Sequence, residues 1–111
     1  MNWIVILAAL SGAVAVGAGA FGAHGAHGAA AEWLKTGGHY QLIHAVAALV
    51  ALTMRARGSA WLFVIGGALF AGSLYAMALG APGKIAGPVT PIGGLLLIAG
   101  WLLLAWTAAR R

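Results

Sequence analysis

Apolar residues fill four long stretches of the chain, and the few charged residues separate them. The uncharged stretches cover residues 1–31, 36–54, 58–83 and 85–109. A helix needs roughly 20 apolar residues to cross a bilayer, with a range of about 17–25, so each stretch has room for one crossing. A membrane barrel would instead show alternating segments of about ten residues. The pattern predicts an all-α membrane protein of one domain, residues 1–111, with four transmembrane helices at 2–24, 39–54, 60–79 and 91–108.

Turn-forming and capping residues set the expected helix ends. Gly37 and Gly38 are expected to separate a short interfacial helix at 29–35 from the second crossing helix. Ser59 is placed to cap the third helix. Thr90 followed by Pro91 is typical of the cap and first residue of a helix, here the fourth. Residues 25–38 and 80–89 are therefore predicted to be connections.

The composition supports lipid as the solvent. Hydrophobic residues make up 63% of the 111 residues and charged residues 6%, whereas a soluble domain carries about 25% charged residues. A small domain buries only a modest fraction of its surface, so a chain this apolar could not hide it from water. We expect the lipid bilayer to be the main partner.

The distribution of charge predicts the orientation. With four crossings, Arg55, Arg57, Arg110 and Arg111 share one side, and Lys35 and Lys84 lie on the other. The positive-inside rule then puts both termini in the cytoplasm. The net charge of +5 is explained by these helix ends, so nucleic acid is not an expected partner.

Small residues recur along the expected helices and predict close helix packing. Helices in lipid associate largely through close approach at small residues, because little hydrophobic force acts between them. Such faces also invite self-association or a place in a larger membrane complex. The glycines expected to pack against other helices are Gly17, Gly19, Gly22, Gly72, Gly93 and Gly94.

Polar side chains gather in the half of the expected bundle away from the cytoplasm. Ionisable groups inside a membrane are costly and commonly functional, but they also lock helices together by hydrogen bonds. Besides such locking, three uses remain open: a small-ligand or ion pocket, metal or haem ligation through His24 and His44, and proton movement through His44. The candidate ligand-binding residues are His24, Tyr40, Gln41, His44, Ser73, Tyr75 and Thr90.

Several kinds of active site are excluded by residue counts. The chain has no cysteine and no aspartate, and Glu32 is its single acid. Thiolate sites, paired carboxylates and Ser–His–Asp triads therefore cannot form. No catalytic residue or dedicated metal site is predicted, and we expect a protein that is not an enzyme and has no cofactor.

Several ordered motifs resemble one known family. They begin with Gly19-Ala20-Phe21-Gly22-Ala23-His24-Gly25 and continue with Trp33 and Thr36, Tyr40-Gln41, His44-Ala45, Gly72-Ser73-Leu74-Tyr75, Thr90-Pro91-Ile92-Gly93-Gly94 and Gly100-Trp101. Together they resemble the YgdD-like small membrane proteins, domain of unknown function 423, whose eukaryotic relative is transmembrane protein 256. The resemblance implies a four-span protein of the inner or mitochondrial membrane, for which we expect the inner membrane of a bacterial cell, and it brings no established activity. His27 and His39 fall outside these motifs.

The sequence as a whole favours a non-enzymatic membrane protein. The first hypothesis is a structural or accessory subunit, and the alternative is a protein that binds or transports a small ligand, an ion or protons through the polar side chains.

Overall fold

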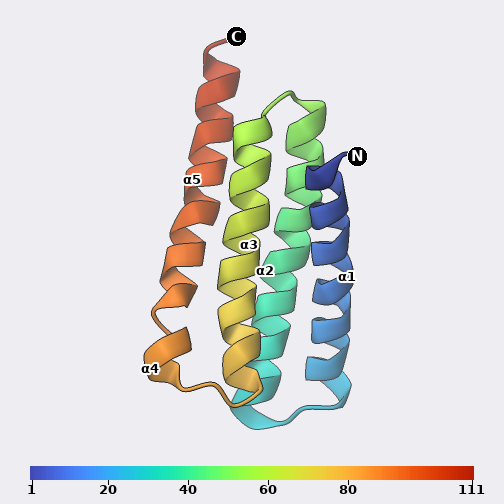
Figure 1. Ribbon diagram of the computed structural model, residues 1–111, viewed down its shortest axis with the longest axis vertical. Helices are drawn as coiled ribbons and strands as arrows, with labels where there is room; N and C mark the ends of the chain where they lie inside the picture. The colour runs from blue at the N-terminus through green and yellow to red at the C-terminus, as the bar shows by residue number, and fades with distance from the viewer.

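The computed structural model describes residues 1–111 as a bundle of antiparallel helices with no strands (Figure 1). Its longest dimension is 47 Å, close to the thickness of a bilayer with its headgroups, about 40–45 Å. The prediction of an all-α protein is confirmed. Four long helices lie side by side, and a single turn, α4, precedes the last. The elements are α1 (Trp3–His24), α2 (Gly28–Thr53), α3 (Arg57–Ala78), α4 (Gly83–Ala86) and α5 (Val89–Ala109).

Three segments are long and apolar enough to cross a membrane: Trp3–His24, Arg57–Ala78 and Gly83–Ala109. The remaining long helix, α2, is the longest at 26 residues and the most polar of the four. It carries Glu32, Lys35, Gln41 and His44 within its length. It packs against both α1 and α3. Gln41 and His44 are buried there, whereas Glu32 and Lys35 are exposed near the start of the helix.

The predicted break at Gly37 and Gly38 is wrong, because α2 begins at Gly28 and runs through both glycines. Each glycine instead lets a neighbour approach α2. A Cβ at Gly37 would stand 2.7 Å from the Tyr75 ring, and one at Gly38 would stand 2.8 Å from the Ala15 carbonyl oxygen. The expected interfacial helix is therefore the first part of α2. Packing outweighs the low helix propensity of glycine here.

Two predicted caps are also wrong. Ser59 lies inside α3, which begins after Ala56, and it is 1% exposed. Thr90 is the second residue of α5, which begins after Pro88. The expected loop at 80–89 contains α4. In each case the helix starts two or three residues earlier than the capping pattern indicated.

The apolar core lies where α1, α2 and α3 meet. Alanine dominates it, with Ala47, Ala48 and Ala51 from α2. Ile4 and Phe63 supply its largest fully buried hydrophobic side chains. Small side chains keep the helices close, so dispersion contacts replace the hydrophobic force that lipid does not provide.

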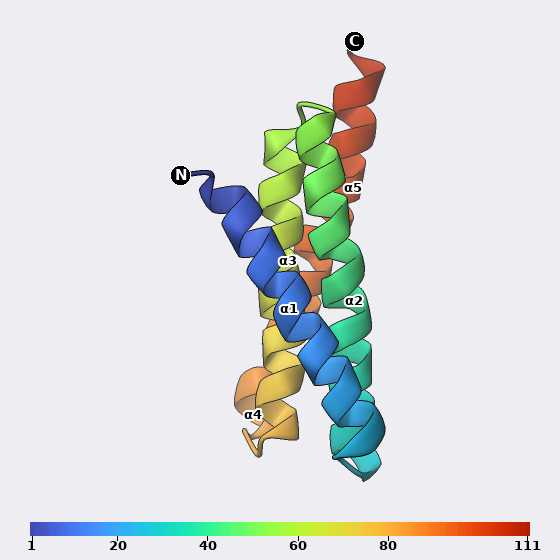
Figure 2. The same ribbon diagram turned by 90° about the vertical axis from the view of Figure 1, so that its right-hand side faces the viewer.

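Both chain termini and the α2–α3 turn lie at one end of the bundle (Figure 1). The Arg111 guanidinium donates to the Arg55 carbonyl oxygen at 3.2 Å, which ties the C-terminus to that turn. We name this end, with Arg55, Arg57, Arg110 and Arg111, the arginine end. The opposite end carries Lys35 and Lys84. Figure 2 shows α1 crossing the other helices at an angle, so that its N-terminus stands apart from the end of α2.

The turns after α2 and α3 have the same hydrogen-bond pattern. After α3, Ala81 N–H donates to the Ala76 carbonyl, and Gly80 between them has a φ of 106°. After α2, Ala56 N–H donates to the Ala51 carbonyl, and the equivalent residue is Arg55 with a φ of 59°. This is the Schellman motif, in which the left-handed residue is usually glycine. An arginine holds that place at the arginine end.

The predicted packing glycines differ in the space around a Cβ built on each, and the Gly19 backbone itself lies against Gly38 of α2. A Cβ at Gly22 would stand 3.0 Å from the Ala31 carbonyl oxygen of α2, and one at Gly93 would collide with the backbone of Phe70 on α3. Gly94 has only an ordinary contact with the Phe70 ring. No atom lies within 4 Å of a Cβ placed at the remaining three, Gly17, Gly19 and Gly72.

Candidate functional site

His44 is the buried centre of the polar side chains, with 6% of its surface exposed. Its Nδ1 lies 2.7 Å from the carbonyl oxygen of Tyr40, one turn earlier in α2. Its Nε2 lies 3.0 Å from the indole Nε1 of Trp101 on α5. An indole N–H can only donate, so Nε2 accepts and Nδ1 carries the proton toward the Tyr40 carbonyl. The two bonds define one neutral tautomer of His44.

Aromatic rings surround the imidazole. The Tyr40 ring stacks on His44 with centroids 6.3 Å apart, and Phe63 and Trp101 approach it to 5.6 and 5.9 Å. The ring centroids of Phe63 and Trp101 lie 4.8 Å apart. The cluster joins α2, α3 and α5, and rings in such tilted and offset arrangements attract one another beyond their area burial.

This geometry limits what His44 can do. A metal would need the Nε2 lone pair, which already accepts from Trp101. A doubly protonated ring would place a second N–H opposite the indole N–H, since both ring nitrogens of the cation are donors. Ligation or proton transfer at His44 therefore requires α5 to release the ring first.

Gln41 and Tyr75 form the second polar pair. The Tyr75 hydroxyl donates to Gln41 Oε1 at 2.7 Å and joins α3 to α2. Gln41 is 7% exposed. The Tyr75 ring lies over Gly37, whose missing side chain leaves the space that the ring occupies. Glycine and tyrosine thus form one contact, which sets how closely α3 approaches α2 near the lysine-bearing end.

Ser73 and Thr90 form the third pair. Their hydroxyl groups hydrogen-bond one another and join α3 to the start of α5. The Ser73 hydroxyl also lies 2.8 Å from the Phe70 carbonyl oxygen and donates to it, so Thr90 supplies the proton between the two hydroxyls. Like the first two pairs, this one links two helices within the chain.

The structure does not bring His24 to the other candidates. His24 ends α1, at the end of the bundle where α2 begins, and it is exposed. His44 lies 16 residues into α2, about 24 Å from its start at 1.5 Å per residue. The structure therefore does not place His24 and His44 in one site. His44 lies farther along its helix than the predicted start of that helix at residue 39 implied.

Sequence reasoning did not select Trp101 as a site residue. Tryptophan favours the membrane interface, yet Trp101 lies in the middle of α5, far from both ends. That position was a usable signal, since a tryptophan at that depth needs a partner for its N–H. Trp101 is 45% exposed, and its indole nitrogen faces His44.

A shallow groove of about 410 Å³ runs over the His44 cluster between α2, α3 and α5. Its lining is mostly apolar, and the single imidazole in it is already paired. The lining residues are Tyr40, His44, Phe70, Gly94, Leu97, Ile98 and Trp101.

Comparison with known proteins gives a consistent result. Residues 18–94 match the model of a family described as "Protein of unknown function (DUF423)". The chain is 44% identical to a UPF0382 membrane protein of Haemophilus influenzae, over 95% of this chain and 92% of that protein. It is 40% identical to the UPF0382 inner membrane protein YgdD of Escherichia coli K12, over 98% and 91%. A UPF0382 membrane protein of Staphylococcus haemolyticus is 39% identical over 94% and 93%. No solved structure matches.

Proposed function

We propose that this chain, which belongs to the DUF423 family of membrane proteins, is a structural or accessory subunit and not an enzyme or a carrier. One observation carries the proposal. His44, the ionisable residue among the buried polar side chains, has both ring nitrogens hydrogen-bonded within the chain, to the Tyr40 carbonyl and the Trp101 indole. Polar groups that satisfy one another between helices fix a shape, whereas a binding site keeps donors or acceptors free for its ligand.

The chain is a multi-pass protein of the bacterial inner membrane. We propose that α2 is its fourth crossing, because α2 packs against the two neighbouring crossings α1 and α3. We also propose that the arginine end faces the cytoplasm, since arginine near helix ends determines topology. Both termini then lie on the cytoplasmic side.

The outward faces suit association with another membrane protein. Gly17 on α1 and Gly72 on α3 have no atom within 4 Å of an added Cβ. The same helices leave large apolar side chains uncovered, such as Val16 at 59% and Phe21 at 51% exposure. Small residues beside large ones allow a second helix to approach closely. This supports self-association or membership of a larger complex.

The alternative is transport of a small ligand, an ion or protons through the polar side chains. It has less support, because two further hydrogen bonds, Tyr75 to Gln41 and Thr90 to Ser73, also join side chains within the chain. A carrier of this kind would have to open α5 away from His44 in each cycle.

Mild purification from native membranes, followed by native mass spectrometry, tests the proposal. We expect a defined assembly, either several copies of this chain or a stoichiometric partner protein, and a Gly17→Leu variant that loses it while remaining folded. Liposomes with the wild-type protein should show the proton flux of empty liposomes. A monomer without partners, or a flux that His44→Ala abolishes, would contradict the proposal.

A further inference from the structure

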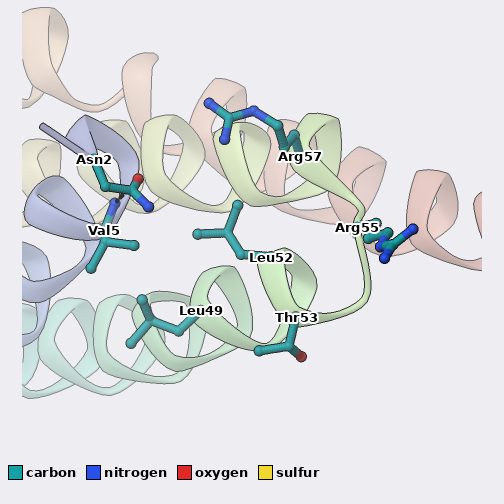
Figure 3. A pocket seen from close by; sticks show the side chains of 7 residues that line it. All are labelled: Asn2, Val5, Leu49, Leu52, Thr53, Arg55 and Arg57. Carbon is teal, nitrogen blue, oxygen red and sulfur yellow. Dashed lines mark hydrogen bonds between the residues drawn. The ribbon is translucent and has the colours of Figure 1, made fainter.

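A groove of about 590 Å³ opens at the arginine end, between the start of α1 and the end of α2. It exists because the tilt of α1 carries its N-terminus away from α2 (Figure 2). Figure 3 shows Asn2 and Val5 on one side of it and the α2–α3 turn on the other. The groove is lined by Asn2, Val5, Leu49, Leu52, Thr53, Arg55 and Arg57.

The lining combines an apolar wall with a polar rim. Val5, Leu49 and Leu52 form the wall. On the rim, the Arg57 side chain extends toward the side where Asn2 lies (Figure 3). The Asn2 side-chain oxygen Oδ1 accepts from the Val5 N–H at 3.4 Å, and the side-chain nitrogen Nδ2 donates to no group of the chain. The rim therefore offers guanidinium and amide donors, which suit an anion.

No acidic side chain neutralises these arginines. The single acid, Glu32, lies near the start of α2 at the opposite end, where it pairs with Lys35 at 3.1 Å. Four arginines share the arginine end. Basic groups at a membrane surface attract anionic headgroups, at about 1 kcal/mol for each residue.

The backbone of Arg55 adds an independent observation. Arg55 is left-handed, with a φ of 59°, in a motif that uses glycine in the equivalent turn after α3. A left-handed conformation is unfavourable for a residue that carries a Cβ. Folding alone would thus favour glycine at this position, and the arginine keeps a positive charge beside the groove at the expense of an unfavourable backbone conformation.

We propose that this groove binds an anionic phospholipid from the surrounding leaflet. Its phosphate lies against Arg57 and the Asn2 amide, with the charge of Arg55 on the adjoining turn, and one acyl chain follows Val5, Leu49 and Leu52. The apolar wall favours a lipid over a soluble anion, because an acyl chain can pack on it and an inorganic anion cannot. The proposal is independent of any partner protein.

The test measures binding of short-chain phosphatidylglycerol to the full-length protein in mild detergent, by native mass spectrometry. Phosphatidylcholine and inorganic phosphate are the comparison probes. We expect Arg57→Gln to weaken phosphatidylglycerol binding about fivefold, as the loss of one surface arginine implies. The matched control is Arg110→Gln, which removes the same charge at the same end from a side chain that lies over Trp106, outside the groove. It should change binding less than twofold.

Arg55→Gly separates lipid binding from folding. Glycine relieves the left-handed backbone, so this variant should match or exceed the wild-type thermal stability while binding phosphatidylglycerol about fivefold more weakly. Arg55→Gly binding the lipid as the wild type does, or Arg110→Gln weakening it as much as Arg57→Gln, would overturn the proposal. Inorganic phosphate that competes fully with the lipid at equal concentration would do the same.

Discussion

The first and last helices are attached to the bundle in different ways. α1 is held by shape: Gly38 of α2 faces the Ala15 carbonyl and the Gly19 backbone, and no side-chain hydrogen bond joins α1 to another helix. α5 has a comparable close contact, Gly93 against Phe70, but it also has the Thr90–Ser73 and Trp101–His44 hydrogen bonds.

The difference shows two ways to hold helices together in lipid. Close backbone approach gives attraction over a surface but allows small slides and rotations. Hydrogen bonds between named atoms also fix rotation and register. α5 covers His44, and both close packing and hydrogen bonds fix its position. Close packing alone fixes the position of the tilted α1.

The largest effect is expected at Gly93, where α5 meets α3. Gly93→Ala places a methyl group against backbone atoms of Phe70, which cannot move aside as a side chain could. We expect a loss of about 3 kcal/mol in the free energy of unfolding, typical of overpacking at its upper end. Steric trapping in bicelles measures it. The neighbouring Gly94→Ala, whose methyl group meets only the Phe70 ring at 3.8 Å, should be neutral or slightly stabilising, and an equal loss there would contradict this account.

A smaller effect is expected at Gly38, where α1 meets α2. The added methyl group would stand 2.8 Å from the Ala15 carbonyl oxygen, but α1 has no hydrogen bond that holds it in place. It can therefore shift, and we expect Gly38→Ala to cost about 1–2 kcal/mol of unfolding free energy. Gly17→Ala on α1 is the control, because its methyl group meets nothing. A larger loss of unfolding free energy from Gly38→Ala than from Gly93→Ala would contradict the view that α5 is held more rigidly than α1.

The smallest effect is the coupling between Trp101 and His44. Trp101→Phe removes the N–H donor and keeps a ring, and His44→Leu removes the acceptor. In a double-mutant cycle on unfolding free energy we expect a coupling of about 1 kcal/mol, within the range found for hydrogen bonds between membrane helices. A coupling near zero would mean that the bond between the two rings adds nothing to the attachment of α5.

The sequence was sufficient for the helical architecture but not for the start of α2. Long uncharged runs indicate the segments that cross the bilayer, so the positions of the seven charged residues were enough to predict the number of long helices. Gly37 and Gly38 were misread because propensity rules come from water, where glycine destabilises a helix. Here the two glycines admit the Tyr75 ring and the α1 backbone, and those contacts depend on residues more than 15 positions away in the chain.

The candidate site was predictable in its residues but not in its pairing. Tyr40, Gln41, His44, Ser73, Tyr75 and Thr90 were all selected because polar groups in an apolar chain need an explanation. Their partners depend on helix rotation, which weakly amphipathic helices do not reveal. The error at the start of α2 also shifted His44 along its helix and grouped it with His24, which lies at the bundle end.

The state of the His44 ring tests the central claim that both of its nitrogens are paired with groups of the chain itself. Nitrogen-15 NMR of the protein in bicelles at neutral pH, with His44→Leu to assign the signals and Trp101→Phe as the test variant, measures it directly. We predict a proton on Nδ1, a bare Nε2 that accepts from the Trp101 indole, and a change in the Nε2 resonance when Trp101 is replaced. A proton on Nε2, a doubly protonated ring, or an Nε2 resonance indifferent to Trp101→Phe would contradict the account.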